Sequence, residues 1–329
     1  MYYLGVDGGG TKTAFEVVDG DGKILSLMKT ETCNYIQIGK DRFGEVIGQG
    51  AAAACAQAGI RPEDLAYVCV GIPSFGEISR DTPELEQIVR GLFPKGRVEC
   101  VNDVVVAWAG SLGCKPGINL LAGTGSMGYG RNAAGREARA GGWGYFCGDE
   151  GSAYWLGKKF VEYFGKEADG RLPKGAVYSI ARESYDFDAD FDFIQIVYEN
   201  LGLRRNEIAK LQLLLCRAAE QGDPCAVESY RQAAEELGLI LSTLIDELGF
   251  APGEAIPVSY SGGVFKAGAL IMQPLREWMR SKGKNISFAP PKLSPVSGAA
   301  LYALRQSGGG ADDAVERLCR AEAGEAPRG

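Results

Sequence analysis

The sequence contains no histidine in its 329 residues. Histidine-based catalytic triads, histidine-ligated metal centres and imidazole acid–base catalysis are therefore excluded. A general base would have to be a carboxylate, a lysine, a tyrosine or a cysteine. The nine cysteines contain no C-x-x-C pair. An odd, unpatterned set of this kind is typical of free thiols in a reducing cytosol, so the sequence predicts a cytoplasmic protein without a disulfide framework or a zinc site.

Long apolar runs and an excess of positive charge are missing as well. The most apolar stretches, such as residues 237–245, are far shorter than the ~20 residues that a membrane-spanning helix needs. The N-terminal residues show neither the basic nor the apolar part of a signal peptide. The net charge of −7 argues against a broad nucleic-acid surface. We therefore expect neither a membrane nor a nucleic-acid partner.

The composition suits a protein with a full hydrophobic core, because 46% of the residues are hydrophobic and 23% are charged. The length favours two domains of ordinary size. In the first part of the chain, hydrophobic patterning predicts strands and helices in alternation. The predicted strands are 3–6, 14–18, 24–28, 67–72 and 98–101, and the predicted helices are 41–58, 83–93 and one from about 104. This order predicts an α/β fold with a mixed sheet and helices on its faces.

The same order of predicted strands begins again after a turn near residue 115. Strands are predicted at 118–122, at 127–131 and near 139, which indicates a duplicated unit. A helical block follows, and a strand, a tight turn and three more helices complete the chain; these elements are predicted at 152–249, 256–261, 267–281, 294–305 and 311–321. The predicted organisation is an N-terminal lobe at 1–115, a second lobe at 116–305 that contains the helical block, and a C-terminal helix within 306–329 that packs back on the first lobe.

Two glycine-rich turns are the most informative features of the chain. The first has the sequence GGGTKT at 8–13, and the second has GTGS at 123–126. Each lies between two predicted strands. Glycine has no Cβ, so backbone N–H groups in such turns can close around an anion. Two such turns in one chain suggest two loops that bind the same polyphosphate, which points to an enzyme that splits a nucleotide.

Neither turn fits a phosphate motif that opens a helix. Gly5 and Gly10 have P-loop spacing, but Thr11 stands where that motif needs lysine, and strand-like sequence follows. Residues 123–128 fit G-x-G-x-x-G, yet the sequence after them cannot easily open a helix, which disfavours a dinucleotide fold. The alternative is a hairpin without a ligand, although three consecutive glycines cost backbone entropy. Asp7, at the end of a strand, could hold Mg²⁺ through water.

Asn102 and Asp103 stand where a predicted strand ends and a helix begins. Aspartate is a common N-cap residue, so capping is one interpretation of Asp103. However, the carboxyl ends of strands at chain crossovers are where α/β sheets bind ligands. Because no histidine is available, Asp103 is the candidate acceptor for the proton of a substrate hydroxyl.

Two further segments have a binding and a structural interpretation. Residues 141–152 form the densest glycine cluster, in which Trp143 could lie against a sugar face and Asp149 could bond its hydroxyls. The alternative is a loop in which Asp149 or Ser152 caps the next helix. In residues 261–265, SGGVF, the glycines would let a flat base lie on the backbone, or would simply form a tight turn.

Taken in order, these segments resemble the actin-like ATPase superfamily. Within it the chain is similar to the N-acetylglucosamine kinase branch, which is grouped with the BadF/BadG/BcrA/BcrD ATPases. The resemblance extends from Tyr3 to about Arg305. It rests on GVDGGGTKT at 5–13, CNY at 33–35, ND at 102–103, AGTGS at 122–126, GGWGYFCGDEGS at 141–152, QGDP at 221–224 and SGGVFK at 261–266. It implies two ribonuclease H-like lobes around a nucleotide cleft that closes over ATP and Mg²⁺.

The resemblance also implies roles for individual residues. Asp103 corresponds to the catalytic base. The implied sugar contacts are Asn34, Asn102, Thr124, Gly142, Trp143, Gly144 and Asp149. The implied ATP contacts are Gly9, Gly10, Thr11, Lys12, Thr13, Gly123, Thr124, Gly125, Gly262, Gly263 and Lys266. Tyr35 and the pair Phe146-Cys147 depart from the family pattern, and they leave the identity of the hexosamine open.

The implied activity is ATP-dependent phosphorylation of an amino sugar hydroxyl. N-acetylglucosamine with its 6-hydroxyl as the acceptor is the first expectation, and glucosamine and N-acetylmuramic acid are alternatives. One rival is an ATPase activator of acyl-CoA dehydratases, in which two cysteines per subunit hold an iron–sulfur cluster at a dimer interface. No spacing pairs Cys114 with Cys147, and the Trp-Gly segment favours the kinase. A sugar sensor without catalysis is the other rival. We expect a homodimer, for which the helical block could supply the interface.

Overall fold

The computed structural model describes residues 1–251, 253–308 and 312–324. The chain divides into two compact units, which we call unit 1 and unit 2. Unit 1 consists of residues 1–116 together with the described residues from Pro290 onward, and unit 2 consists of residues 117–289. The sequence placed the end of the second lobe at residue 305. That boundary is wrong, because residues 290–305 belong to unit 1.

Unit 1 contains a five-stranded mixed sheet in the order β3-β2-β1-β4-β5. The strands β1 (Tyr2–Gly8), β2 (Lys12–Asp19) and β3 (Ile24–Glu31) form an antiparallel meander. The strands β4 (Leu65–Ile72) and β5 (Arg97–Asn102) run parallel to β1. The carboxyl ends of β1, β4 and β5 therefore lie at one edge of the sheet, where α/β folds bind ligands.

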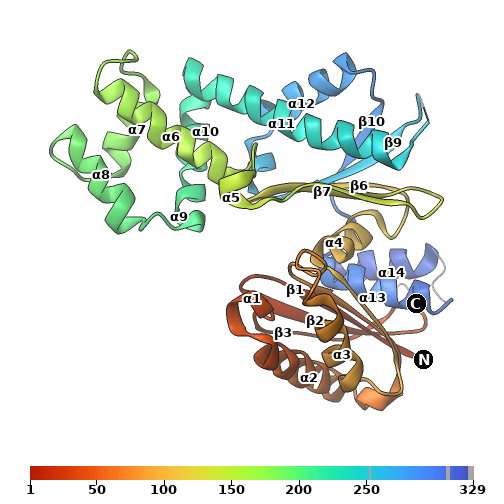
Figure 1. The fold of residues 1–329 in the computed structure, drawn as a ribbon. Coiled ribbons are helices and arrows are strands. Elements are labelled where there is room, and N and C mark those ends of the chain that lie inside the picture. The colour runs from red at the N-terminus through yellow and green to blue at the C-terminus, as the bar shows by residue number, and fades with distance from the viewer. Residues whose placement is uncertain (252, 309–311, 325–329) are drawn as a thin grey trace. The chain divides into compact units, whose positions relative to one another are not determined.

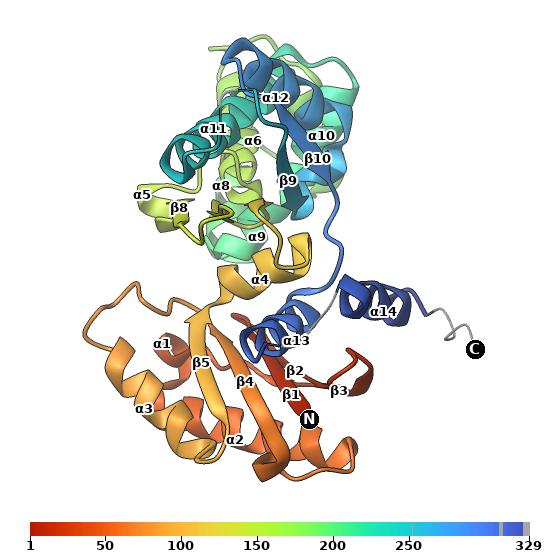
Figure 2. The same ribbon diagram turned by 90° about the vertical axis from the view of Figure 1, so that its right-hand side faces the viewer.

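Helices cover both faces of this sheet (Figures 1 and 2). On one face lie α2 (Lys40–Gln57) and α3 (Thr82–Leu92), and on the other lie α4 (Asp103–Leu112) and α13 (Pro295–Gln306). The stripe of Phe43, Val46 and Ile47 on α2 is buried against the sheet, as the helical spacing predicts. The short helix α1 (Tyr35–Ile38), the 3₁₀ turn at Pro62–Asp64 and α14 (Asp312–Glu322) complete unit 1.

Glycines explain why α13 packs so closely in unit 1. A Cβ added at Gly5 in β1 would lie 2.1 Å from the backbone nitrogen of Ala300 in α13. A Cβ added at Gly298 would lie 2.3 Å from the backbone nitrogen of Gly110 in α4. These backbones approach one another because neither glycine has a side chain. Contacts of this kind decide the unit to which residues 290–305 belong, and no local pattern in the sequence reports them.

Unit 2 repeats the sheet of unit 1 with the order β10-β9-β6-β7-β8. The strands β6 (Gly117–Ala122), β7 (Ser126–Arg131) and β8 (Glu137–Gly141) form the antiparallel meander. The strand β9 (Ile256–Ser261) runs parallel to β6, and β10 (Ile286–Ala289) runs parallel to β9. The predicted α/β class with a duplicated sheet is confirmed. The sequence analysis missed β10, which has only four residues.

The helices of unit 2 form two groups. The long helix α11 (Pro224–Leu248) packs on the sheet beside α12 (Ala269–Ser281), and the other helices extend beyond the edge of the sheet (Figure 1). These others are α5 (Gly144–Cys147), α6 (Ala153–Ala168), α7 (Ala176–Ser184), α8 (Phe193–Gln195), α9 (Arg205–Lys210) and α10 (Gln212–Glu220), with a 3₁₀ turn at Asp190–Asp192 and a π-helix at Ile196–Asn200.

Two predicted helices need comment on where they begin. The helix predicted from 267 starts at Ala269, because a 3₁₀ turn at Gly263–Ala267 comes first and Gly268 has a positive φ of 59°. The helix predicted from 311 is α14. Its predicted first residue lies outside the described residues.

Candidate functional site

The first glycine turn joins β1 to β2 and is closed by one backbone hydrogen bond. The N–H of Gly9 donates to the carbonyl oxygen of Lys12 at 2.9 Å. Gly10, Thr11 and Lys12 are exposed at the tip of the turn, whereas Thr13 is buried in β2. The turn therefore presents a short run of exposed backbone, which suits an anion.

Gly8 lets this turn lie directly on its neighbours in unit 1. A Cβ at Gly8 would be 2.4 Å from Sγ of Cys33 and 2.7 Å from the carbonyl oxygen of Gly71 at the end of β4. A larger residue would push the turn away from the ends of the parallel strands. The sequence analysis gave Cys33 no role beyond the family pattern, but its thiol lies at the base of the turn.

Asp7 lies one residue before the end of β1 and is half-buried. Burial raises the pKa of the Asp7 carboxyl to about 6, and the positive charge of Lys12 opposes this rise. A desolvated carboxylate is stabilised by a nearby cation. Mg²⁺ prefers oxygen ligands and keeps much of its water shell. Asp7 therefore fits its predicted part as a ligand of Mg²⁺ through water.

Asp103 is the first residue of α4 and is partly exposed. It does not cap its helix, because Asn102 is the N-cap residue. The amide oxygen of Asn102 accepts a hydrogen bond from the N–H of Val104 at 3.2 Å, and its amide nitrogen donates to the carbonyl oxygen of Phe75 at 2.8 Å. Asn102 thus fixes the start of α4, and the capping interpretation of Asp103 is not needed.

Asp7 and Asp103 lie at the same edge of the sheet in unit 1, where the parallel strands β1, β4 and β5 end. Burial raises the pKa of the Cys33 thiol to about 11, and the negative charges of both carboxylates add to the rise. The register of the strands agrees with this placement, since Asp7 pairs with Gly71 of β4, and Ile72 of β4 pairs with Asn102, the residue before Asp103. Unit 1 brings together the first glycine turn, the predicted metal ligand and the predicted base at the carboxyl ends of its strands.

Asn34 is connected to the first turn through a residue that the sequence analysis missed. The Thr32 hydroxyl donates to the carbonyl oxygen of Gly9 at 2.7 Å, and the N–H of Asn34 donates to the same hydroxyl oxygen at 3.0 Å. The amide oxygen of Asn34 accepts from the N–H of Ile36 at 3.1 Å and so caps α1. A single threonine before a cap carries no recognisable signal, so only the structure reveals this connection.

The second glycine turn joins β6 to β7 in unit 2. The N–H of Gly123 donates to the carbonyl oxygen of Gly125 at 2.9 Å, and the carbonyl oxygen of Gly123 accepts from the N–H of Ala153 at 2.8 Å. The second bond attaches the turn to the N-terminus of α6. Thr124 is exposed at the tip.

The turn predicted to bind adenosine lies beside the second glycine turn. A Cβ at Gly262 would be 2.3 Å from the carbonyl oxygen of Ala122, and Gly262 has a φ of 109°. Gly263 opens the 3₁₀ turn on which Lys266 is exposed. The predicted phosphate and adenosine residues of unit 2 are therefore adjacent, because β6 and β9 are neighbouring strands.

The segment at 141–152 contains a short helix, so its description as a loop is wrong in part. Trp143 precedes α5 and is 78% exposed, and Gly144 is the first residue of α5. Gly142 is held by its neighbours, since its N–H donates to the carbonyl oxygen of Ser126 at 2.9 Å. The hydroxyl oxygen of Ser152 accepts from the N–H of Trp155 and caps α6.

Asp149 is only 3% exposed and has a positive φ of 62°, which is uncommon outside glycine. One carboxylate oxygen accepts from the N–H of Ser126 at 3.2 Å, and the other pairs with Arg205 at 2.5 Å. The sequence analysis missed Arg205, which lies in the helical block with no motif around it. Asp149 lies under the second turn, and its contact with a sugar stays a prediction.

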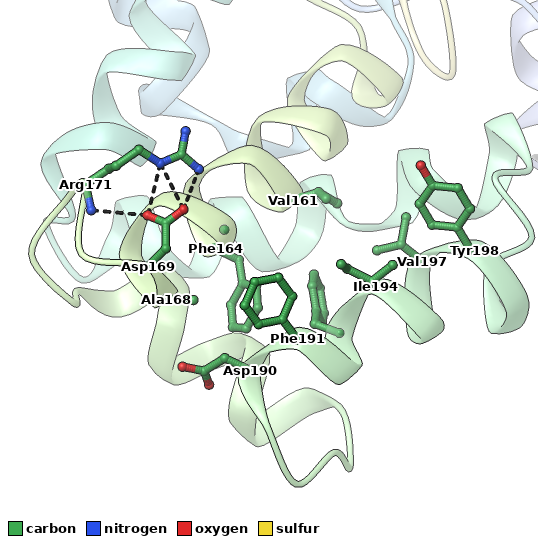
Figure 3. A pocket seen from close by; sticks show the side chains of 12 residues that line it. Val161, Phe164, Ala168, Asp169, Arg171, Asp190, Phe191, Ile194, Val197 and Tyr198 are labelled. Atoms are coloured by element: carbon green, nitrogen blue, oxygen red, sulfur yellow. Dashed lines mark hydrogen bonds and ion pairs between the residues drawn. The ribbon is translucent and has the colours of Figure 1, made fainter.

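An apolar cavity of about 420 Å³ lies elsewhere in unit 2 and includes none of the predicted site residues. Figure 3 shows Phe164, Phe191, Ile194 and Val197 around it, with the Asp169–Arg171 ion pair at its rim. We call this cavity and the exposed side chains of Phe191, Ile194 and Tyr198 the apolar groove.

The comparison with known families matches one family model to residues 4–303, which is most of the chain. The chain belongs to the BadF/BadG/BcrA/BcrD ATPase family. The family stated from the motifs is therefore confirmed, and membership of an ATPase family implies that ATP is used. No group of three or more cysteine, aspartate or glutamate side chains placed to hold a metal ion occurs in the described part of the chain.

Two curated relatives are amino sugar kinases by name. One is an N-acetylmuramic acid/N-acetylglucosamine kinase of Clostridium acetobutylicum, 28% identical over 92% of this chain and 98% of the relative. The other is an N-acetyl-D-glucosamine kinase of Dictyostelium discoideum, 27% identical over 92% of this chain and 97% of the relative. The solved structure of a candidate N-acetylglucosamine kinase from Chromobacterium violaceum is 27% identical with a TM-score of 0.67, over 92% of this chain and 98% of that one.

Within residues 1–251, 253–308 and 312–324, no helix is both long enough and apolar enough to cross a bilayer.

Proposed function

We propose that this protein is an ATP-dependent amino sugar kinase, with N-acetylglucosamine as its first candidate substrate and the 6-hydroxyl as the acceptor. The observation that carries the proposal is that the first glycine turn, Asp7 and Asp103 lie at the carboxyl ends of the parallel strands of unit 1. Such an edge combines an anion-binding turn, a candidate metal ligand and a candidate base. The names of the two curated relatives supply the substrate class.

In the proposed reaction, Asp103 accepts the proton of the sugar hydroxyl. The hydroxyl oxygen forms the new bond to the γ-phosphorus, and the bond from that phosphorus to the oxygen bridging to the β-phosphorus breaks, so ADP leaves. A positioned general base contributes about 10²- to 10⁴-fold in rate. Asp103 is partly exposed at the start of a rigid helix, so its carboxylate has access to a substrate while its backbone is fixed by Asn102.

The phosphates of ATP would be held by backbone and side-chain donors of Gly9, Gly10, Thr11, Lys12 and Thr13 in unit 1 and of Gly123, Thr124 and Gly125 in unit 2. Gly262, Gly263 and Lys266 would contact the adenosine. Mg²⁺ held by Asp7 through water would neutralise charge that develops on the phosphoryl oxygens. The desolvated Asp7 carboxylate supports this assignment, because a nearby cation favours its charged form.

The sugar would contact Trp143 with its apolar face and Asp149 with its hydroxyls, and Asn34 and Gly144 would complete the contacts. Trp143 is 78% exposed, which is unusual for so large an apolar side chain unless a ligand covers it. The exposed Phe146 beside it is a departure from the family pattern. Glucosamine and N-acetylmuramic acid therefore remain alternative acceptors.

The test measures sugar-dependent ADP release over a panel of amino sugars and plain hexoses. We expect an amino sugar to give the highest kcat/KM, and phosphorus NMR of the product identifies the hydroxyl that reacts. Asp103→Asn should lose at least about 100-fold in kcat, as expected for a general base. Asp41→Asn is the matched control, because Asp41 also lies in the first turn of a helix of unit 1 and is exposed.

Several outcomes would overturn the proposal. An Asp103→Asn variant that folds and keeps wild-type turnover removes the assigned base. ADP release that no sugar stimulates removes the kinase, and a brown protein with iron–sulfur absorbance would favour the dehydratase-activator alternative. Sugar binding in calorimetry without any product would favour a sensor.

We also propose a cytoplasmic homodimer that pairs through the apolar groove. Phe191, Ile194 and Tyr198 are 79%, 54% and 62% exposed, and together they form an apolar face that a second copy could cover. Light scattering should give about twice the chain mass of 35.0 kDa. Phe191→Ser should weaken the dimer, whereas Leu239→Ser, on an exposed face of α11, should not. A wild-type protein that is monomeric at all concentrations would contradict this.

A further inference from the structure

Arg205 connects three parts of the candidate site in unit 2. It is the first residue of α9 and follows Asp149 by 56 residues in the sequence. One of its terminal nitrogens donates to the carboxylate of Asp149 at 2.5 Å. Its guanidinium carbon lies 5.8 Å from the ring centre of Tyr145 in α5. A cation from the helical block therefore contacts the segment that contains Trp143.

Arg205 also lies against the second glycine turn. A Cβ at Gly125 would be 2.4 Å from a terminal nitrogen of Arg205 and 2.7 Å from the carboxylate of Asp149. The ion pair thus occupies the space that a side chain of residue 125 would need. The turn, the carboxylate and the guanidinium are packed as one group, and the side chain of Arg205 is still 39% exposed.

The positive charge of Arg205 lies beside the carboxylate of Asp149, which is only 3% exposed. Burial disfavours an ionised carboxylate, and an adjacent guanidinium favours it. An ionised carboxylate only accepts hydrogen bonds and offers about four lone-pair positions. Ser126 and Arg205 each use one, which leaves positions for two sugar hydroxyls.

We propose that Arg205 is a positioning residue for sugar binding: it holds the Asp149 carboxylate in the orientation in which it can accept hydrogen bonds from the hydroxyls of the sugar. This inference rests on the proposed kinase function. Arg205 acts through Asp149 and through the second turn, and it takes no part in proton or phosphoryl transfer.

The experiment compares Arg205→Ala and Arg205→Lys with the wild type and with Arg204→Ala. Arg204 is a suitable control because it is the adjacent, exposed arginine and its side chain donates to the carbonyl oxygen of Asn200. Loss of a hydrogen bond to a charged group should raise the KM of the amino sugar about 10- to 100-fold in Arg205→Ala. Arg205→Lys keeps the charge and should recover part of this loss, and added guanidinium ion should rescue Arg205→Ala.

Two further measurements distinguish positioning from a merely structural role. In Arg205→Ala the sugar KM should rise while kcat changes little, because Arg205 positions a residue that binds the sugar and takes no part in proton or phosphoryl transfer. Arg205→Ala should also add little to the effect of Asp149→Asn in a double variant. Sugar binding without ATP, followed by the fluorescence of the exposed Trp143, reports the same effect apart from turnover.

The outcomes separate this inference from the proposed function. If the wild type phosphorylates no sugar, the proposed function fails and the inference fails with it. If the wild type is active and folded Arg205→Ala has a normal sugar KM, only the inference is overturned. Additive effects of Arg205→Ala and Asp149→Asn, or failure of Arg205→Lys and guanidinium to rescue, would also overturn it. If Arg205→Ala does not fold, Arg205→Gln, which removes the charge and keeps most of the side-chain volume, provides the same comparison.

Discussion

Replacement of Glu16 by glutamine should change the pH dependence of stability of unit 1. Glu16 lies in β2 beneath α13 and is 0% exposed. One of its carboxyl oxygens accepts from the Ser297 hydroxyl at 2.8 Å, and the other has no hydrogen-bond partner among the described residues. Burial raises the pKa of Glu16 to about 7, the hydrogen bond from Ser297 opposes the rise, and the charge of Glu322 adds to it.

The sign of the effect follows from this raised pKa. Below pH 4.5, the usual pKa of glutamate, the carboxyl is neutral in both the folded and the unfolded chain. As the pH rises to about 7, the unfolded chain loses the proton while the folded protein keeps it, so the free energy of unfolding falls. Above about 7 the loss is complete. At about 1.4 kcal/mol per pH unit, this interval corresponds to about 3 kcal/mol.

Glutamine cannot ionise, so Glu16→Gln should not lose this stability between pH 4.5 and 7. Burial of the amide costs free energy, but that cost is the same at every pH and does not change the slope. The assay is urea unfolding from pH 4.5 to 8, followed by hydrogen exchange of peptides from β2 and α13. Glu63→Gln, on the surface of unit 1, is the control. Parallel pH curves for the wild type and Glu16→Gln would refute the reasoning.

Three other predictions concern packing, reactivity and metal binding. Gly298→Ala should destabilise unit 1 by about 1–3 kcal/mol in urea titration, because its Cβ would lie 2.3 Å from a backbone atom. Gly165→Ala in α6 has open space and should stabilise the protein by about 0.5–1 kcal/mol. Equal effects of the two substitutions would contradict this packing. Cys33 is buried and its pKa is raised to about 11, so it should resist iodoacetamide while the exposed Cys147 reacts. Mass spectrometry of the labelled peptides measures both rates. Early labelling of Cys33 would contradict its burial at the base of the first turn. Asp7→Asn should raise the Mg²⁺ concentration needed for half-maximal turnover at least about tenfold, and an unchanged Mg²⁺ dependence would remove Asp7 from the metal site.

The parts of the fold that depend on local patterning could be predicted from the sequence. Alternating strands and glycine turns recur at the start of each unit, so the duplicated sheet and both turns were expected and are found. Asp103 was expected at the end of a strand, because the short strand predicted at 98–101 leads directly into Asn102 and a helix. These features depend on neighbours in the sequence, which a pattern can show.

The remaining features depend on contacts between distant residues. Arg205 meets Asp149 only because the helical block folds back on the second turn, and nothing near residue 205 indicates this contact. The boundary at residue 289 depends on the close approach of Gly5 to α13. The strand β10 is too short to give a clear alternation, and its pairing with β9 alone defines it.

The return of the chain to unit 1 after residue 289 has a consequence for biosynthesis. Unit 2 is continuous in sequence, so it can complete its fold while the ribosome is still translating. Unit 1 must wait, because the helix that lies against its first strand is encoded almost 290 residues later. Until then the face of the sheet that carries Gly5 lacks this cover, whereas Leu4 and Val6 lie on the opposite face, against α2. A nascent chain halted before residue 290 should therefore expose β1 to proteases and chaperones, even though unit 2 is already folded.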